Sequence, residues 1–91
     1  CGLVWVRGKE SNRQAVPALQ RMDYRGYDSF GFACLTDVGI EVQRSLECLR
    51  EVETNLPSSH MVLGHTRWAT HGSVSLANCH PHFDSLGRFA L

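Results

Sequence analysis

The chain has 91 residues, of which 43% are hydrophobic and 20% charged, and its nine basic residues balance nine acidic ones. This composition is that of one ordinary globular domain and excludes disorder of the whole chain. The balanced charge argues against a nucleic-acid surface, and no apolar run is long enough to span a membrane. No signal-peptide pattern opens the chain, so we expect a cytoplasmic protein.

The first predicted elements are a strand and a helix. Residues 1–7 form a run rich in Val and Trp and predict a buried strand. Residues 10–22 predict a helix that Ser11 or Asn12 caps. Pro17 interrupts this helix, and a proline in a helix interior costs roughly 3 kcal/mol. We therefore expect the helix either to begin close to the proline or to bend there.

A polar and aromatic turn follows at residues 23–29. We interpret it as structural: a salt bridge between Arg25 and Asp28 fixes the turn, and Tyr24 and Tyr27 pack on either side of it. The turn matters for function if it lies against the first residue of the chain.

The remainder predicts a β-hairpin, a short helix, a strand, a long loop and the start of another strand. In chain order these are 30–36 with 40–47, 46–55, 61–66, 73–87 and 88–91. Because the last apolar run has no terminator, we expect the front part of a larger domain.

The cysteines and histidines allow a metal-binding alternative. No pair of cysteines has the C-x-x-C spacing, so we expect reduced thiols and no zinc ribbon. Cys79, His80 and His82 are nevertheless ligand types close together. Pro81 between the two histidines favours a rigid bend whose imidazoles bond to the backbone. A small metal-binding protein remains the less favoured alternative.

The first residue offers a thiol and an α-amino group together. The free amine has a reference pKa of about 7.7–8.0 and can act as a base near neutral pH. The thiol of Cys1, with a reference pKa of about 8.5, needs modest help to become a nucleophilic thiolate. One residue can thus hold both nucleophile and base. The plain alternative is a numbering that begins at a cysteine after trimming.

The segment "HTRWATHG", residues 65–72, contains the strongest binding pattern. Arg67 supplies a planar, permanently charged fork that suits a carboxylate. Thr70 and His71 add polar groups, and Trp68 is a large apolar lid that can exclude water. Together they suit an amino-acid ligand. The alternative for each residue alone is a polar loop that folds on itself around a buried tryptophan.

Four blocks of the sequence, taken in order, resemble the start of the glucosamine-6-phosphate synthase family, the isomerizing glutamine–fructose-6-phosphate aminotransferases. The blocks are "CGLV", "RMDYRGYDSFG", "GHTRWATHG" and "NCHPH". The resemblance is weak between Glu41 and Met61. It implies that residues 1–91 are the N-terminal part of a type-2 (class II) glutamine amidotransferase domain, incomplete at its C-terminus.

The resemblance also implies a role for each site residue. Cys1 is the catalytic nucleophile toward the amide of L-glutamine, and Arg25 packs beside it as a supporting residue. Arg67 holds the glutamine α-carboxylate. The substrate-binding loop that closes over glutamine consists of Trp68, Thr70, His71 and Gly72. The family implies no metal and no cofactor.

The implied fold is α+β: a truncated αββα sandwich with antiparallel sheets, of the N-terminal nucleophile (Ntn) hydrolase class. The implied reaction of the parent enzyme transfers the amide nitrogen of glutamine to fructose 6-phosphate, giving glucosamine 6-phosphate and glutamate. Its partners are then glutamine and the sugar-phosphate isomerase domains of a homo-oligomeric parent, with neither nucleic acid nor membrane. Since the family's oxyanion-hole Asn-Gly pair would follow Leu91, a polypeptide ending there should be nearly inert. A non-catalytic relic or glutamine-binding fragment is the second alternative.

Two residues depart from the family pattern. Trp5 stands where the family usually has a small residue, so we expect it to crowd the first strand. Pro17 interrupts a segment that the family makes helical.

Overall fold

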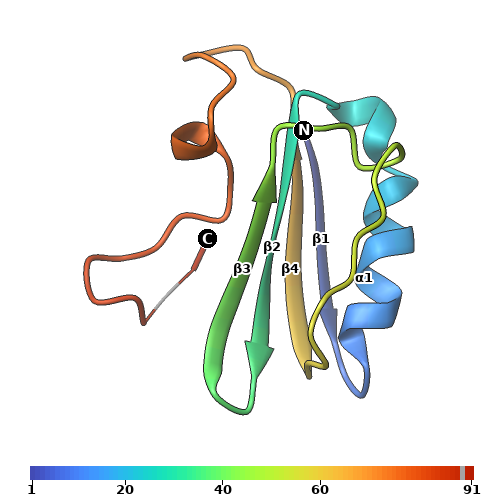
Figure 1. Ribbon diagram of the computed structural model, residues 1–91, viewed down its shortest axis with the longest axis vertical. Coiled ribbons are helices and arrows are strands. Elements are labelled where there is room, and N and C mark those ends of the chain that lie inside the picture. The colour runs from blue at the N-terminus through green and yellow to red at the C-terminus, as the bar shows by residue number, and fades with distance from the viewer. Residues whose placement is uncertain (89) are drawn as a thin grey trace.

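The computed structural model describes residues 1–88 and 90–91. At its centre lies one antiparallel sheet of four strands, with the edge strands β1 and β3 on either side of β4 and β2 (Figure 1). The strands are β1 (Gly2–Arg7), β4 (Met61–Arg67), β2 (Ser29–Thr36) and β3 (Gly39–Ser45). The predicted first strand, hairpin and 61–66 strand are confirmed. The predicted strand at 88–91 includes Phe89, which lies outside the described residues, and Ala90 forms a single bridge with Phe83.

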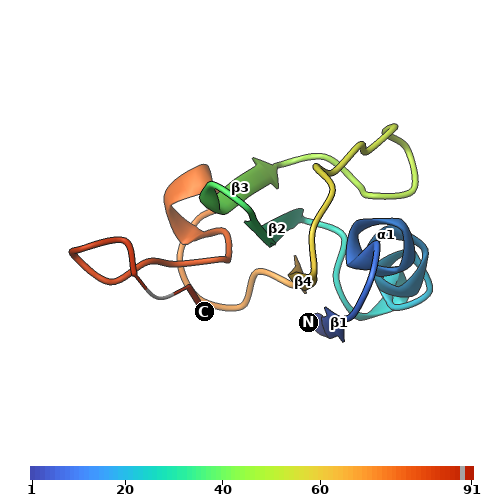
Figure 2. The same ribbon diagram turned by 90° about the horizontal axis from the view of Figure 1, so that it is seen from below.

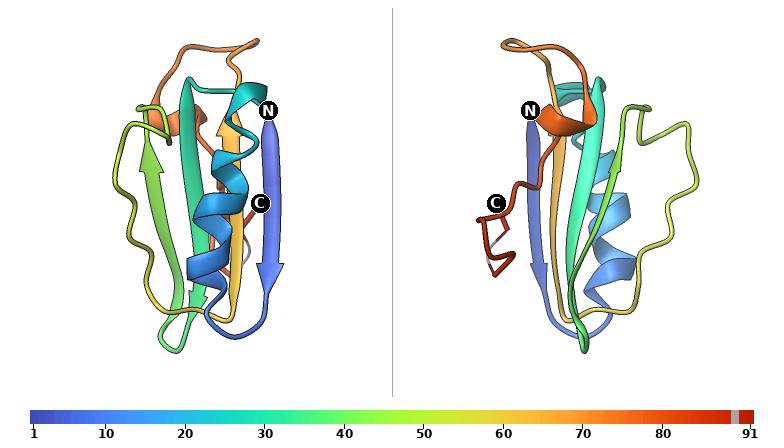
Figure 3. Two further views of the ribbon diagram at one scale, coloured as in Figure 1. Left: turned by 90° about the vertical axis from the view of Figure 1, so that its right-hand side faces the viewer. Right: turned by 60° about the vertical axis from the view of Figure 1, so that its left-hand side comes forward.

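The one α-helix of the described residues, α1 (Ser11–Gln20), lies across one face of the sheet against β4 and β1 (Figure 3, left). The predicted caps are wrong: Glu10 is the N-cap, in a left-handed conformation with φ of 52°. The Ser11 hydroxyl instead donates to the Gly8 carbonyl at 2.7 Å. Pro17 lies inside the helix on its exposed side, so a helix start beside the proline is also wrong.

The core forms between the helix and the face of the sheet that it covers. Because side chains alternate along a strand, the register of the pairs assigns each residue to a face. The covered face carries the larger buried side chains, which pack on Ala15 and Leu19 of α1. These sheet residues are Phe30, Phe32, Cys34 and Val62, with Val4 and Val6 partly buried at the edge.

The opposite face of the sheet is apolar and largely exposed near β1. Leu3 and Trp5 are each 60% exposed, and the same face carries Leu63 and Ala33 in register with Trp5. The prediction that residues 1–7 form a buried strand is therefore wrong in one respect: β1 is an edge strand with one covered face. Trp5 lies on the open face, so it does not crowd the strand as expected.

Residues 46–60 connect β3 to β4 without the predicted helix at 46–55, which is wrong. Leu49 is buried in the core, and Val52 and Leu56 pack against it. A helix of this length is marginal in water, and here the apolar side chains reach the core from an irregular chain. Figure 2 shows this segment and α1 on the same side of the sheet.

The C-terminal segment passes to the opposite side of the sheet (Figures 1 and 2). It contains a short 3-10 helix at Leu76–Asn78 and a cis peptide bond between His80 and Pro81. His82 and Leu91 then exchange two backbone hydrogen bonds of 2.7 and 2.8 Å. One helix layer and one antiparallel sheet make the chain a mixed α and β structure, compatible with part of an αββα sandwich. Within the described residues, no helix is long and apolar enough to cross a membrane.

Candidate active site

The two parts of the predicted site, Cys1 and the loop after β4, meet at the end of the sheet where β1 starts and β4 ends. β1 starts beside the end of β4, with Gly2 opposite Thr66 in register, because the two strands are antiparallel. The backbone N–H of Gly2 donates to the Thr66 hydroxyl at 3.1 Å in a buried position. This pairing places Cys1 directly next to the end of β4, where the loop begins.

The thiol and the amine of Cys1 each have a backbone partner. The N–H of Trp68 donates to the sulfur at 3.4 Å. The α-amine donates to the carbonyl of Arg25, the last residue of the 3-10 turn Asp23–Arg25. Cys1 itself is exposed, so its thiol is open to a ligand.

The turn at 23–29 lies against both Cys1 and the loop. A Cβ added at Gly26 would approach the Arg67 carbonyl carbon to 2.5 Å and the Trp68 nitrogen to 2.6 Å, so the glycine permits this contact. The predicted ion pair of Arg25 with Asp28 is wrong. The Asp28 carboxylate instead accepts the N–H of Ala69 at 2.8 Å.

Arg67 holds the loop that follows it. The residue is 8% exposed, and its Nη1 donates to the Ser73 carbonyl at 2.8 Å. Its Nη2 donates to the carbonyls of His71 and Gly72. A guanidinium has five N–H donors, so these three bonds do not use all of them. Gly72 adopts a φ of 75°, a conformation that favours glycine.

The remaining loop residues form the rim of the site. Trp68 is 50% exposed, which excludes the alternative of a buried core tryptophan, and its ring lies 5.8 Å from that of Tyr27. Thr70 and His71 are exposed on the loop. Asn78 stabilises the end of the loop, since its side-chain amide donates a hydrogen bond to the Ser73 carbonyl at 3.0 Å. The expected packing of the turn tyrosines is absent, as Tyr27 is 59% exposed and points to the tryptophan.

Three histidine rings lie in contact with tilted and edge-on geometry, and His65 of the three is on the open face of the sheet. The rings of His65 and His80 are 4.4 Å apart, as are those of His80 and His82. Burial, together with the charges of the other two histidines, the Cys1 amine and Arg67, lowers the pKa of His65 to about 4. His65 is therefore neutral near pH 7, and it adds no positive charge near Arg67 or the Cys1 amine.

Cys79, His80 and His82 do not converge as metal ligands. The buried Cys79 thiol donates to the Phe30 carbonyl at 3.0 Å, and His80 Nδ1 lies 2.9 Å from the Leu91 carbonyl oxygen. The predicted bonding of an imidazole to the backbone is thus confirmed for His80. Across residues 1–88 and 90–91, no group of three His, Cys, Asp or Glu side chains could hold a metal ion.

Sequence reasoning missed three supporting residues: Thr66, Asp28 as a partner of the loop, and Asn78. The bonds of Thr66 and Asp28 join residues 64 and 41 positions apart, and the bond of Asn78 joins residues five positions apart across the loop. No local pattern signals such bonds, because only the strand register and the loop path bring the partners together.

Comparison with known proteins finds similar aminotransferases. An aminotransferase from Streptomyces coelicolor is 42% identical over the whole chain, and one from Bradyrhizobium diazoefficiens is 46% identical over 90% of it. A third, from Sulfolobus acidocaldarius, is 40% identical over the whole chain. All three are named glutamine–fructose-6-phosphate aminotransferase [isomerizing].

The chain is a relative of the amino-terminal segment of these aminotransferases. It spans only 14–17% of the length of the aminotransferases named here. No family model matches the chain. The family resemblance of the four sequence blocks is confirmed. Cys1 and the loop at 67–72, which the resemblance singled out, lie at the same end of the sheet.

Proposed function

We propose that this chain provides the nucleophile and the glutamine-binding loop of the glutamine-hydrolysing domain of a glutamine–fructose-6-phosphate aminotransferase. The observation that carries the proposal is the contact between the two predicted halves of the site. The Cys1 sulfur lies 3.4 Å from the Trp68 nitrogen, one residue beyond Arg67. A free amino acid can then place its side-chain amide at the thiol while its α-carboxylate reaches the guanidinium.

In the proposed reaction, the Cys1 sulfur attacks the side-chain amide carbonyl of glutamine while the α-amine takes the thiol proton. The amine returns that proton to the leaving nitrogen, so ammonia departs and a γ-glutamyl thioester remains. Water, deprotonated by the same amine, hydrolyses the thioester to glutamate and frees the thiol. Arg67 and the loop at 68–72 bind and orient the substrate and limit water near the sulfur.

The acceptor chemistry rests on the names of the relatives. We infer that ammonia passes to fructose 6-phosphate on sugar-isomerising domains of the parent, which yields glucosamine 6-phosphate. A homo-oligomeric parent and a cytoplasmic location stay predictions from the sequence.

We also infer that residues 1–91 form part of a larger amidotransferase domain in which a second antiparallel sheet covers the open face. That face has a mostly apolar cavity of about 280 Å³ between Trp5 and Ala90. Phe83 and Ala90, which form a bridge, already lie on this side of the sheet, where they line cavities with Val42 and Leu63 respectively. A second layer would remove the exposed Leu3 and Trp5 side chains from water. Such burial stabilises the folded protein by roughly 25 cal/mol for each Å² of apolar surface that it covers.

The nucleophile is tested with a diazoketone analogue of glutamine and peptide-resolved mass spectrometry. We expect a covalent label on Cys1 that free glutamine slows, and none on a Cys1→Ala variant. Cys48 serves as an internal control, because it is a second thiol that is not fully buried, and we expect no label on it. A label that glutamine does not slow would contradict the binding site, and an unlabelled Cys1 would favour the relic or binding fragment.

The second layer is tested by tryptophan quenching in a Trp68→Phe background, in which Trp5 is the only fluorophore of its kind within the chain. We expect acrylamide to quench Trp5 less in a protein that continues past residue 91 than in the 91-residue chain. Equal quenching in both would overturn the proposed cover of this face.

A further inference from the structure

The turn at Asp23–Arg25 supports the nucleophile and the loop at once. Its last carbonyl, that of Arg25, accepts the hydrogen bond from the Cys1 amine. The adjacent Gly26 packs directly on the backbone of Arg67 and Trp68. A displacement of this turn would therefore move the Cys1 amine, which is the base of the proposed reaction, relative to the substrate loop.

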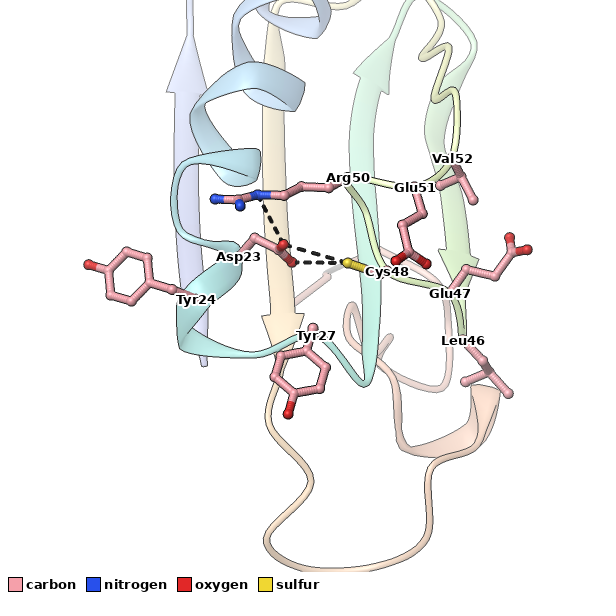
Figure 4. Close-up of a pocket in the computed structure, with 9 residues that line it drawn as sticks. All are labelled: Asp23, Tyr24, Tyr27, Leu46, Glu47, Cys48, Arg50, Glu51 and Val52. Atoms are coloured by element: carbon pink, nitrogen blue, oxygen red, sulfur yellow. Dashed lines mark hydrogen bonds and ion pairs between the residues drawn. The ribbon is translucent and has the colours of Figure 1, made fainter.

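Asp23 fixes the turn through the contacts of its buried carboxylate. The residue is 6% exposed, and a buried carboxylate is costly unless it is paired. Arg50 Nε lies 3.1 Å from one carboxylate oxygen, and the Cys48 thiol donates to the carboxylate at 3.5 and 3.6 Å. Figure 4 shows the carboxyl group of Asp23 between these two side chains.

The partners of Asp23 come from a distant part of the chain. Cys48 and Arg50 belong to the irregular 46–60 segment, in the region where the sequence resemblance to the family is weak. Arg50 Nε also lies 3.4 Å from the Gln20 carbonyl at the end of α1, where a cation is favoured by the helix dipole. One guanidinium thus ties the helix end to the turn.

We propose that Asp23 is a positioning residue for the nucleophile, and that Arg50 is its partner. Held by Arg50 and Cys48, Asp23 keeps the turn in the place where the Arg25 carbonyl orients the Cys1 amine toward its own thiol. Among the described residues, the Asp23 carboxylate contacts Arg50 and the Cys48 thiol and not the Cys1 thiol, so Asp23 acts through the turn. This inference rests on the proposed role of Cys1. It gives a positioning role to Arg50 in the 46–60 segment, where the resemblance to the family is weak.

The test measures the rate at which the diazoketone analogue labels Cys1 in the complete protein, as a function of reagent concentration. For Asp23→Asn we expect the maximal rate to fall about tenfold or more, since a 1 Å misplacement can cost on the order of 100-fold. The concentration for half-maximal rate should change less than the maximal rate, because the Arg67 guanidinium also holds the substrate loop. Arg50→Met should lower the maximal rate similarly, and Arg50→Lys should restore most of it.

Two controls separate positioning from folding. Asp37→Asn makes the same change at the hairpin tip, where the carboxylate is 94% exposed, and should leave the rate unchanged. The buried Cys34 and Cys79 report unfolding, so their reaction with iodoacetamide should stay slow in every variant. The double variant Asp23→Asn with Arg50→Met should be no slower than either single variant, as expected for one coupled pair.

The outcomes distinguish the two proposals. Wild-type protein that takes no glutamine-sensitive label at Cys1 overturns the proposed function. Normal wild-type labelling with an unchanged maximal rate in Asp23→Asn overturns only the positioning role. A slow rate that comes with fast labelling of Cys34 and Cys79 also overturns it, because the residue would then act on folding alone.

Discussion

The backbone N–H of Trp68 donates a hydrogen bond of 3.4 Å to the sulfur of Cys1, although 67 residues separate the two in sequence. This contact exists because β1 and β4 are antiparallel neighbours, so the start of one strand lies at the end of the other. The first residue therefore lies next to the loop that the arginine holds. The following predictions test the parts of this arrangement.

Arg67→Lys should weaken binding of glutamine. An ammonium cannot make the two-pronged contact with a carboxylate, and it cannot reach three loop carbonyls at once. Hydrogen bonds to charged groups contribute about 1.5–3 kcal/mol each, so we expect at least a tenfold rise in the glutamine concentration that half-protects Cys1 from labelling. Arg7→Lys, at the far end of β1, is the control. Equal protection in Arg67→Lys and wild type would refute the assignment.

Gly26→Ala should destabilise the protein. The new methyl group would lie 2.5 and 2.6 Å from backbone atoms of Arg67 and Trp68, which cannot rotate away. We expect the free energy of unfolding in urea to fall by about 1–3 kcal/mol, the usual cost of overpacking. Gly39→Ala serves as a comparison, because alanine is strained at the φ of +126° found there but its methyl group meets no atom within 4 Å. A smaller loss at Gly26 than at Gly39 would contradict the close approach.

Stability should fall on mild acidification because of His65. Its pKa is about 6.5 in the unfolded chain and about 4 in the folded protein. Below pH 6.5 the unfolded state therefore binds a proton that the folded state does not, and the free energy of unfolding decreases as pH falls toward 4. Urea titrations at pH 7 and 5.5 measure this decrease.

His65→Gln should lose less stability than wild type over the same pH interval, because it removes the titrating group. His71→Gln, a change on the exposed loop, should behave as wild type. If wild type and His65→Gln show the same dependence, His65 is not buried as described.

The thiol of Cys34 should be far less reactive than that of Cys1. Burial, opposed in part by a hydrogen bond with Ser59, raises the pKa of Cys34, and nearby Glu41 adds to the rise. We expect iodoacetamide at pH 8 to label Cys34 at least ~100-fold more slowly than Cys1, because a core thiol reacts only when the chain opens. A time course by mass spectrometry measures both rates, and 6 M urea should remove the difference. Comparable native rates would contradict the burial of Cys34.

Some of the fold was predictable from the sequence, and the failures have a common cause. The strands at 29–36, 39–45 and 61–67 carry continuous or alternating apolar residues with a tight turn between the first two, and these local signals were sufficient. The segment at 46–55 also has apolar residues at helical spacing, yet it is irregular. Its leucine and valine side chains reach the core without a helix, and that choice depends on the sheet beneath them.

The candidate site shows the same division. Residue types allowed a nucleophile with its own base at Cys1 and a carboxylate-binding cation at Arg67, and the family resemblance implied those roles. They did not indicate that Asp28 would bond to Ala69 instead of Arg25. A carboxylate has several possible partners in a polar turn, and the path of the loop decides among them.

By itself, the sequence determined the chemical groups, which are a leading thiol with its amine and a guanidinium, and it carried the four blocks that resemble the aminotransferases. The tertiary structure decided which backbone atoms those groups meet, and that the turn held by Asp23 lies under both halves of the site. The physical reason is the distance along the chain over which each property acts. Side-chain chemistry and periodic patterns are local properties, whereas strand register and burial depend on contacts between residues far apart in the chain.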